Sequence, residues 1–392
     1  MIGSSAISSA GQEEEQLGPF PMHRLKRVDH PTVAITDAVQ RIDAREEPFN
    51  KAQRGDYGEA VQRDVAHLLG REPINAAQVD VIHQLASIAD NEVAERAPIP
   101  TDPTLLSRHV KRLGYFLGAD IIGVCRVPYY AMYSHDPSGK PLDLDYPNAI
   151  VIVRHKDHQM GEASSGTDMM GTTLSFQGYL PCALIAHTMS NYLRRLGFRA
   201  APQHAGRAEG RRYQVLLPPL LLMAGIGEVS RAGIILNPFL GLEYKAAVIL
   251  TDMPLEPDKP IDFGLQDFCE RCKFCADACP SHAIPHGGKV MYNGYETWKL
   301  DERRCACFNI SSPYGTMCHT CVKVCPWTRP NTWPHDTIRW LVQHSGLARQ
   351  TVINADRLWR RLRPENKKDQ WWFELEYRGG RLETANHPAK SE

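Results

Sequence analysis

The feature that most constrains this chain is the uneven distribution of its cysteines. Nine of the eleven lie between Cys269 and Cys325, in a chain of 392 residues. Disulfide frameworks spread their cysteines through small secreted domains, so this clustering predicts a metal-binding segment instead. The two remaining cysteines, Cys125 and Cys182, lie in apolar sequence and are expected to be buried as small hydrophobic residues.

The first part of the segment has the spacing C-x2-C-x2-C-x3-C-P, which is typical of bacterial ferredoxins. Its cysteines are Cys269, Cys272, Cys275 and Cys279. Three thiolates on one tight loop can bind three irons of a four-iron four-sulfur cluster, whereas the fourth thiolate points to a neighbouring cluster. This loop therefore implies that a second cluster lies nearby.

A second set of cysteines repeats the last two spacings and is also followed by proline. Its members are Cys318, Cys321 and Cys325. The missing first ligand has to come from upstream, where Cys305 and Cys307 are both available. We predict two ligand sets: Cys269, Cys272, Cys275 and Cys325 for one cluster, and Cys279, Cys318, Cys321 and one of the upstream pair for the other.

Clustered cysteines can also bind a structural zinc ion or attach a haem. A structural zinc ion takes four tetrahedral ligands, which leaves the repeated x3-C-P spacing unexplained. Covalent haem needs C-x-x-C-H, and His319 follows the wrong cysteine of its pair. Two adjacent clusters transfer electrons but perform no chemistry of their own, so the rest of the chain has to supply the reaction.

Composition and hydropathy limit the kinds of partner that this chain is expected to bind. Lys plus Arg and Asp plus Glu number 45 each, so no net charge favours nucleic acid as a partner. The longest apolar stretches, such as 215–226 with its two prolines, are too short to span a membrane. Residues 1–16 contain no basic region followed by an apolar run, and we expect a cytoplasmic protein with no membrane partner.

Hydrophobic periodicity divides the chain into four segments. Short apolar runs at 121–124, 149–153 and 246–250 read as strands, and helical patterns occupy 76–94, 105–117 and 184–196. We expect a polar helical lead-in over 1–100, an α/β or α+β domain over 101–260, an iron-sulfur domain over 261–335, and a tryptophan-rich segment over 336–392 that wraps over the body.

Several phrases precede the cysteines in a fixed order. They are Gly118-Ala-Asp-Ile-Ile-Gly123, Tyr192-Leu-Arg-Arg-Leu-Gly197, Ala224-Gly-Ile-Gly-Glu228 and Thr251-Asp-Met-Pro-Leu-Glu256. Each phrase alone is a weak signal, but their order ahead of this cysteine pattern is typical of one protein family. From about Leu105 to Trp333 the chain resembles the reductive dehalogenases, corrinoid-dependent iron-sulfur enzymes that replace carbon-halogen bonds by carbon-hydrogen bonds.

The resemblance implies an α+β fold with a nitroreductase-like cobalamin-binding core and a C-terminal ferredoxin-like domain holding two 4Fe-4S clusters. It also implies base-off cobalamin without a protein histidine on cobalt, in keeping with the absence of a D-x-H-x-x-G loop. The match is closest to the cytoplasmic, catabolic branch, which acts on halophenols. Because the chain has no room for a fused flavin reductase, an external electron-donor protein is implied.

Two other functions are compatible with the cysteine motifs. Epoxyqueuosine reductase, a corrinoid-dependent tRNA-modifying enzyme, has similar cysteine motifs and a phrase like Leu300-Asp-Glu-Arg-Arg-Cys305. In both families that phrase favours Cys305 over Cys307 as the upstream ligand. The chain shows no helical-repeat tail and no basic excess suited to tRNA. The other alternative is a two-cluster electron carrier without cobalamin.

The resemblance also assigns catalytic roles. Tyr179 matches the family's catalytic tyrosine, and its position opening a helical pattern predicts a helix N-terminus that would stabilise a phenolate. Lys245 occupies the position of the family's cationic residue, where an ammonium group would lower the pKa of the phenol and attract a phenolate substrate. Glu243 is an alternative partner for this lysine. The expected corrin contacts are Gly225, Gly227, Arg231, Gly233 and Asn237.

Overall fold

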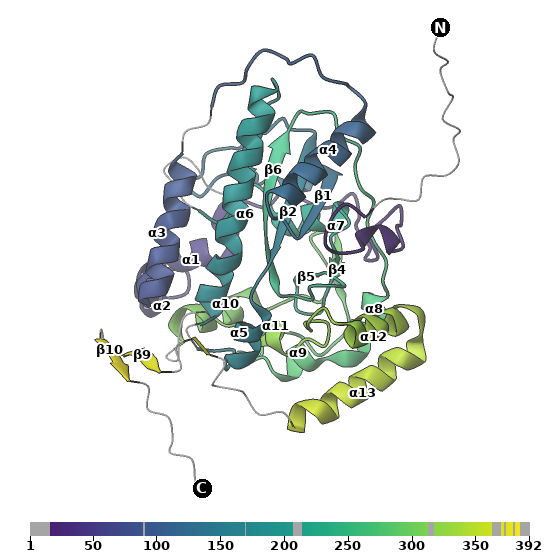
Figure 1. Ribbon diagram of the computed structural model, residues 1–392. Helices are drawn as coiled ribbons and strands as arrows, with labels where there is room; N and C mark the ends of the chain where they lie inside the picture. Colours follow the sequence, from purple (N-terminus) through teal and green to yellow (C-terminus); the bar gives the residue numbers. More distant parts are fainter. Residues whose placement is uncertain are drawn as a thin grey trace.

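The computed structural model describes residues 16–88, 91–168, 170–206, 214–312, 317–362, 370–371, 374–378 and 381–384 (Figure 1). Its longest helix is α6 (Met170–Arg195), which crosses most of the larger domain. Across these described ranges, no helix combines the length and the apolar character that a membrane span requires.

The larger domain is built on a four-stranded antiparallel sheet with the order β1-β2-β6-β3. The strands are β1 (Ile121–Arg126), β2 (Asn148–His155), β3 (Ala200–Gln203) and β6 (Tyr244–Thr251). The three apolar runs that predicted strands coincide with β1, β2 and β6. Because all pairings are antiparallel, the fold is α+β and not α/β, which confirms the fold class implied by the resemblance.

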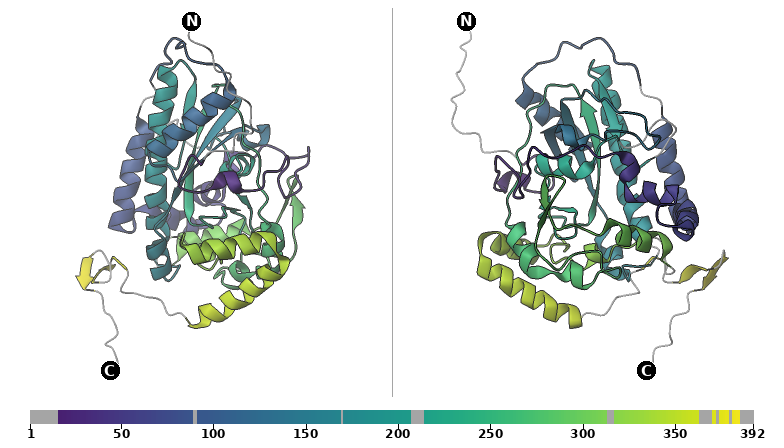
Figure 2. Two further views of the ribbon diagram at one scale, coloured as in Figure 1. Left: turned by 45° about the vertical axis from the view of Figure 1, so that its right-hand side comes forward. Right: turned by 180° about the vertical axis from the view of Figure 1, so that it is seen from behind.

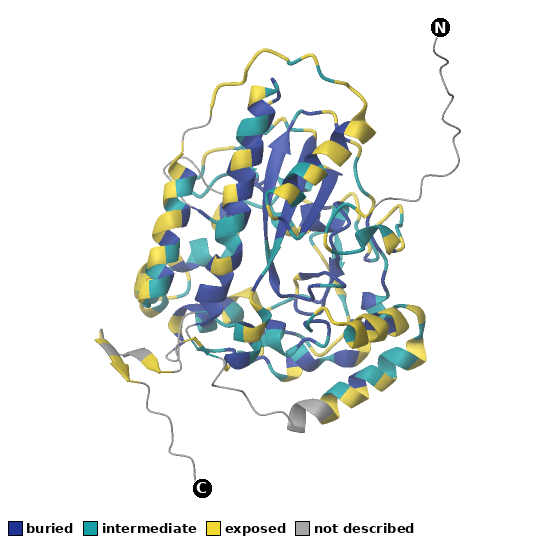
Figure 3. Ribbon diagram, viewed as in Figure 1, coloured by how far each residue is buried: buried dark blue, intermediate teal, exposed yellow. Residues whose placement is uncertain are grey.

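Both faces of this sheet are buried, which explains why its strands read as continuous apolar runs (Figure 3). Ile150 and Ile152 point to the face covered by α4 (Pro103–Phe116) and α6, whereas Ala149 and Val151 point to the opposite face. That opposite face packs against α7 (Leu217–Met223). The sheet therefore holds its loops and strand ends in fixed positions.

Helix α6 is longer than its sequence pattern predicted. The pattern starts at Leu184, but the helix already begins at Met170, and the residues from 170 to 176 are all buried. Its outer side packs against α3 (Pro73–Ser87), which ends before the predicted limit at Ala94. Pro181 lies inside α6 and has no N–H to donate to the carbonyl of Gln177, four residues earlier.

The N-terminal segment contacts the iron-sulfur segment as well as the sheet. Its helices α1 (Pro48–Arg54) and α2 (Glu59–His67) pack against α10 (Glu302–Ser311). Buried contacts between Ala52, Val65 and Ile310 form a small separate core there. The N-terminal segment is thus anchored to the iron-sulfur segment at α10.

The iron-sulfur segment consists of one hairpin and short helices, and the helices lie below the sheet in Figure 1. Besides α10, its elements are α8 (Leu265–Cys272), α9 (Phe274–Asp277), α11 (Thr320–Lys323), β7 (Val290–Tyr292) and β8 (Tyr295–Thr297). Its hydrophobic core continues into Leu236, at the end of the hairpin formed by β4 (Glu228–Val229) and β5 (Ile235–Leu236). The two domains therefore share a core.

The C-terminal segment adds α12 (Trp333–His344) and α13 (Gly346–Leu362), which lie along the iron-sulfur segment (Figure 2). Val342 and Ile353 are buried in the core of the iron-sulfur segment. Arg349 forms an ion pair with Asp267 of α8 at 2.9 Å. A short hairpin, β9 (Leu375–Arg378) and β10 (Arg381–Thr384), follows. Trp372 of the tryptophan-rich segment lies outside the described residues.

Candidate active site

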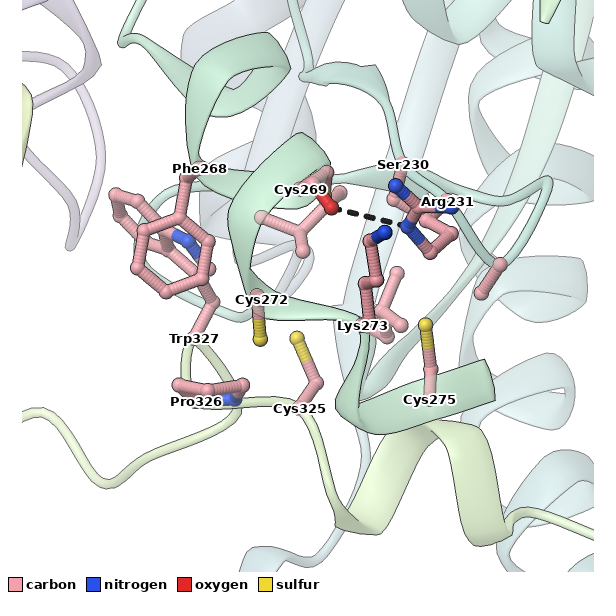
Figure 4. Close-up of a pocket in the computed structure, with 13 residues that line it drawn as sticks. Ser230, Arg231, Phe268, Cys269, Cys272, Lys273, Cys275, Cys325, Pro326 and Trp327 are labelled. Carbon is pink, nitrogen blue, oxygen red and sulfur yellow. Dashed lines mark hydrogen bonds between the residues drawn. The ribbon is translucent and has the colours of Figure 1, made fainter. Parts of the chain in front are cut away.

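The eight cysteines predicted as cluster ligands fall into two spatial groups. The first group lines one cavity, shown in Figure 4: Cys269, Cys272, Cys275 and Cys325. Lys273 has a left-handed backbone with φ of 58°, so the chain turns sharply between α8 and α9 and presents neighbouring cysteines to the same cavity. Burial raises the pKa of the Cys269 and Cys275 thiols, and the neighbouring thiols of the group raise it further.

The second group is identified by the mutual influence of its thiols. Burial raises the pKa of Cys321 to about 12, and Cys318, Cys305 and Cys279 add to the shift in this order. Burial likewise raises the pKa of Cys305 to about 11, with contributions from Cys279 and Cys318. Cys279 and Cys318 also accept backbone N–H groups of Ala283 and Thr320, at 3.3 and 3.4 Å.

The two candidates for the upstream ligand both lie on α10 but face different neighbours. Cys305 lies beside the thiols of the second group, whereas Cys307 acts on the pKa of Tyr57, which follows α1. Asn309 connects Cys305 to Cys318, because its amide donates to the Cys305 sulfur at 3.4 Å and its oxygen accepts from the Cys318 N–H. This geometry favours Cys305, and no sequence motif had indicated Asn309.

The donor chemistry of both groups fits four-iron clusters, which are held by four thiolates. Within the described part of the chain, no three thiol, imidazole or carboxylate groups are close enough to hold one metal ion. The thiols instead surround a space, as Figure 4 shows for the first group. Backbone N–H groups directed at sulfur are among the features that set cluster reduction potentials.

Arg231 was expected to contact the corrin, and the structure corrects this expectation. The side chain is 1% exposed, and all three guanidinium nitrogens donate to backbone carbonyls of the iron-sulfur segment. The carbonyls belong to Cys269, Glu270, Pro285 and Gly287, at 2.7 to 3.3 Å. Arg231 therefore fastens the first cluster loop to the core, with four of its five N–H groups donating to carbonyls and its third nitrogen 3.5 Å from the Glu270 carboxylate.

Asn237 and two of the glycines also require correction as corrin contacts. The Asn237 amide donates to the Ile226 carbonyl at 2.6 Å, and its oxygen accepts two backbone N–H groups of its own turn. A side chain at Gly225 would meet the Lys259 carbonyl, and one at Gly227 would meet the Leu236 carbonyl. These glycines permit close approach of the chain to itself. Gly233, with φ of 73°, has no such close neighbour.

Tyr179 and Lys245 come together although they are far apart in the sequence. Tyr179 projects from α6 and Lys245 from β6, and the lysine Nζ lies 4.7 Å from the centre of the tyrosine ring. Both side chains are partly exposed, and the ring of Tyr179 also packs against Phe176. The pairing predicted for these residues is thus present in the geometry, at the end of the sheet nearest the iron-sulfur segment.

The electrostatic environment of this pair differs from the one predicted from the sequence. Tyr179 lies well inside α6 and not at its N-terminus, so the partial charge of the helix end does not act on it. Burial raises the pKa of Tyr179 to about 12, with smaller increases from Cys182 and Glu47. Burial lowers the pKa of Lys245 to about 8. At neutral pH the phenol keeps its proton and the ammonium group keeps its charge.

Gly178 allows this close approach of α6 to β6. A Cβ at this position would lie 2.9 Å from Cγ and 3.0 Å from Cβ of Lys245. We predict that Gly178→Ala lowers both the free energy of unfolding, by about 1 to 3 kcal/mol, and the turnover, because the strand atoms cannot move away. Denaturant unfolding and rate assays measure both effects. Gly70→Ala, which enters open space, is the control, and equal behaviour of the two variants would contradict the prediction.

Three residues near this pair were not singled out as functional by the sequence, namely Lys156, His158 and His319. Lys156 is 4% exposed and follows β2, and Glu243 is buried and accepts from His158 at 2.6 Å. The structure thus pairs Glu243 with a histidine and not with Lys245. His319 is buried, and neither ring nitrogen makes a hydrogen bond of ordinary geometry within the described residues. Such a group is expected where a polar ligand completes the packing.

Comparison with known proteins agrees with this arrangement. Residues 268–328 match the family model described as a 4Fe-4S dicluster domain. The tetrachloroethene reductive dehalogenase of Sulfurospirillum multivorans is 30% identical over 300 residues, which are 67% of this chain and 58% of that protein. The catabolic reductive dehalogenase NpRdhA in complex with 3-bromo-4-hydroxybenzoic acid superposes with a TM-score of 0.86 at 33% identity, over 94% of this chain and 53% of that chain.

A further reductive dehalogenase structure, described as suggesting a mechanism for B12-dependent dehalogenation, has a TM-score of 0.86 at 34% identity over the same shares. The chain is thus an iron-sulfur protein whose α+β core packs against the dicluster segment. A second candidate site, with Tyr179 and Lys245, lies at the end of its sheet. The chain belongs to the reductive dehalogenase family. It spans 53% to 58% of the length of these three relatives.

Proposed function

We propose that this chain is a cobalamin-dependent reductive dehalogenase that replaces a carbon-halogen bond of a haloaromatic, such as a halophenol, by a carbon-hydrogen bond. The observation that carries the proposal is the Tyr179–Lys245 pair, placed between the sheet and the second group of cysteines. The relative whose structure superposes over nearly the whole chain binds 3-bromo-4-hydroxybenzoic acid, a haloaromatic of this kind.

The proposed cofactors are two 4Fe-4S clusters and base-off cobalamin without a histidine on cobalt. The clusters would be held by the two cysteine groups described above. When bound, cobalamin supplies the reducing centre that acts on the carbon-halogen bond. The unpartnered ring of His319 and the partly exposed Tyr179 and Lys245 provide polar surface that such a ligand would cover. An external electron-donor protein and a cytoplasmic location complete the proposal.

In this proposal, Tyr179 and Lys245 together supply the proton that replaces the halogen. The overall reaction consumes two electrons and one proton and releases halide. Tyr179 holds a proton on its hydroxyl, because its pKa is about 12, and donates it to the carbon that loses the halogen. The Lys245 ammonium group then lies beside the developing phenolate and stabilises its negative charge.

This assignment predicts an alkaline limit on turnover. The pKa of Lys245 is lowered to about 8, so its charge is present below this pH and is lost above it. We expect the rate of halide release to fall as the pH rises through about 8. Since the pKa of buried Lys156 is also lowered to about 8, the matched variant is Lys245→Arg. Because arginine keeps its charge, this variant should lose turnover only at a higher pH. If turnover still falls near pH 8, the titrating group is not Lys245.

The experiment that tests the proposal is anaerobic reconstitution with iron, sulfide and hydroxocobalamin, followed by metal counting and a bromophenol assay. About eight irons and one cobalt per chain, with bromide release, would establish the function. About eight irons without cobalt would leave a two-cluster electron carrier. Binding of tRNA with a steep salt dependence, in place of bromide release, would favour the tRNA-modifying alternative.

A further inference from the structure

Lys156 is a buried cation beside the candidate active site that the mechanism above does not use. It is 4% exposed, and its backbone N–H donates to the carbonyl of Glu243 at 2.9 Å. This bond continues the antiparallel register of β2 and β6, in which Arg154 faces Lys245. Lys156 stands two residues after Arg154, so it lies on the same face of the sheet as Lys245.

The two lysines also share one surface of α6. A Cβ at Gly178 would lie 2.9 Å from Cγ of Lys245 and 3.2 Å from Cγ of Lys156. Both aliphatic stems therefore pack on the helix at the residue that precedes Tyr179. The absence of a side chain at Gly178 allows the two lysines to approach α6 from neighbouring strands, next to Tyr179 in the helix.

The carboxylate beside this pair is engaged by histidines. Within the described part of the chain, neither lysine forms an ion pair, and Glu243 is engaged by His158 at 2.6 Å and approached by His155 at 4.0 Å. Burial and Lys245 disfavour the charge of Lys156, whereas Glu243 and the Cys321 thiol favour it. A buried ammonium group without an ion pair is costly unless an anion binds it.

We propose that Lys156 is a second anion-binding residue of this site, which together with Lys245 selects aromatic substrates that carry an ionised oxygen on the ring. The proposal rests on the proposed function and narrows it from haloaromatics in general to halophenolates. A neutral haloaromatic would leave both ammonium groups without an anionic partner. A phenolate oxygen would accept from both.

Equilibrium binding tests this without turnover. The probes are 4-nitrophenolate and its neutral analogue 4-nitroanisole, measured by dialysis against the reconstituted protein without reductant. Lys156→Met replaces the ammonium group by an apolar side chain of similar length, a change that buried sites tolerate. We expect it to weaken 4-nitrophenolate binding about tenfold or more while 4-nitroanisole binding stays unchanged. Lys156→Arg, which keeps the charge, should retain most of the preference.

The control variant is Lys140→Met, which removes one charge from an exposed loop and should leave both probes unaffected. Equal weakening of both probes by Lys156→Met would show a packing role and overturn the proposal, as would unchanged 4-nitrophenolate binding. A wild-type protein that binds neither probe, or shows no preference between them, would overturn it too. Selective phenolate binding without bromide release from bromophenol would instead overturn the proposed dehalogenase function and leave the anion site standing.

Discussion

Tyr179→Phe is expected to lower the turnover for bromide release by about 100-fold or more, the range in which a general acid contributes. The substitution removes only the hydroxyl, which makes no hydrogen bond within the described residues, and keeps the ring that packs against Phe176 and α3. Iron, cobalt and the free energy of unfolding should therefore match the wild type. Bromide release under anaerobic conditions measures the loss.

The matched control for this prediction is Tyr192→Phe. Tyr192 belongs to the same helix, and its hydroxyl lies 2.7 Å from His109, away from Lys245. Removing this hydroxyl should leave turnover close to that of the wild type. Normal turnover in Tyr179→Phe would exclude Tyr179 as the proton donor, whatever its distance from Lys245.

Cys305→Ala is expected to reduce the iron content from about eight to about four per chain, because it removes one of the four thiolates of the second group. Asn309, which now links the Cys305 sulfur to the backbone N–H of Cys318, would also lose its contact with this sulfur. Iron and sulfide analysis, with spectroscopy of the reduced clusters, measures the loss. Turnover should fall with it if electrons reach the active site through this cluster.

Cys307→Ala serves as the control for this loss, since it removes a thiol from the same helix two residues further on. Cys307 lies toward Tyr57, so the variant should keep about eight irons. The opposite pattern, with the second cluster lost in Cys307→Ala and kept in Cys305→Ala, would reverse the ligand assignment. Loss in both variants would mean that helix α10 itself has to be intact for the cluster to form.

The sequence predicted those parts of the structure that depend on local spacing. Cysteine spacing indicated the two ligand groups, and apolar runs located β1, β2 and β6, because both signals repeat over a few residues. The start of α6 was missed, since the residues from 170 to 176 are buried on all sides and carry no helical periodicity. As a result, Tyr179 was placed at a helix end when it lies inside the helix.

Residues whose role depends on strand register were not predictable in the same way. Lys156 and Lys245 are on the same face only because β2 pairs with β6 in one particular register, which no local pattern specifies. The glycines of the segment 225–233 suggested room for a cofactor, but Gly225 and Gly227 accommodate the chain's own backbone. The resemblance assigned Arg231 to the corrin, but its guanidinium donates to carbonyls of the iron-sulfur segment, a contact that no local sequence pattern specifies.

The bonding of Arg231 has a consequence for how the protein matures. One side chain from the β4–β5 hairpin holds the carbonyl of Cys269 and three further carbonyls of the same segment. These bonds are made by the polypeptide alone, so folding of the larger domain can position the first cysteine loop before iron and sulfide arrive. Cluster assembly then begins on a loop that the rest of the protein has already shaped.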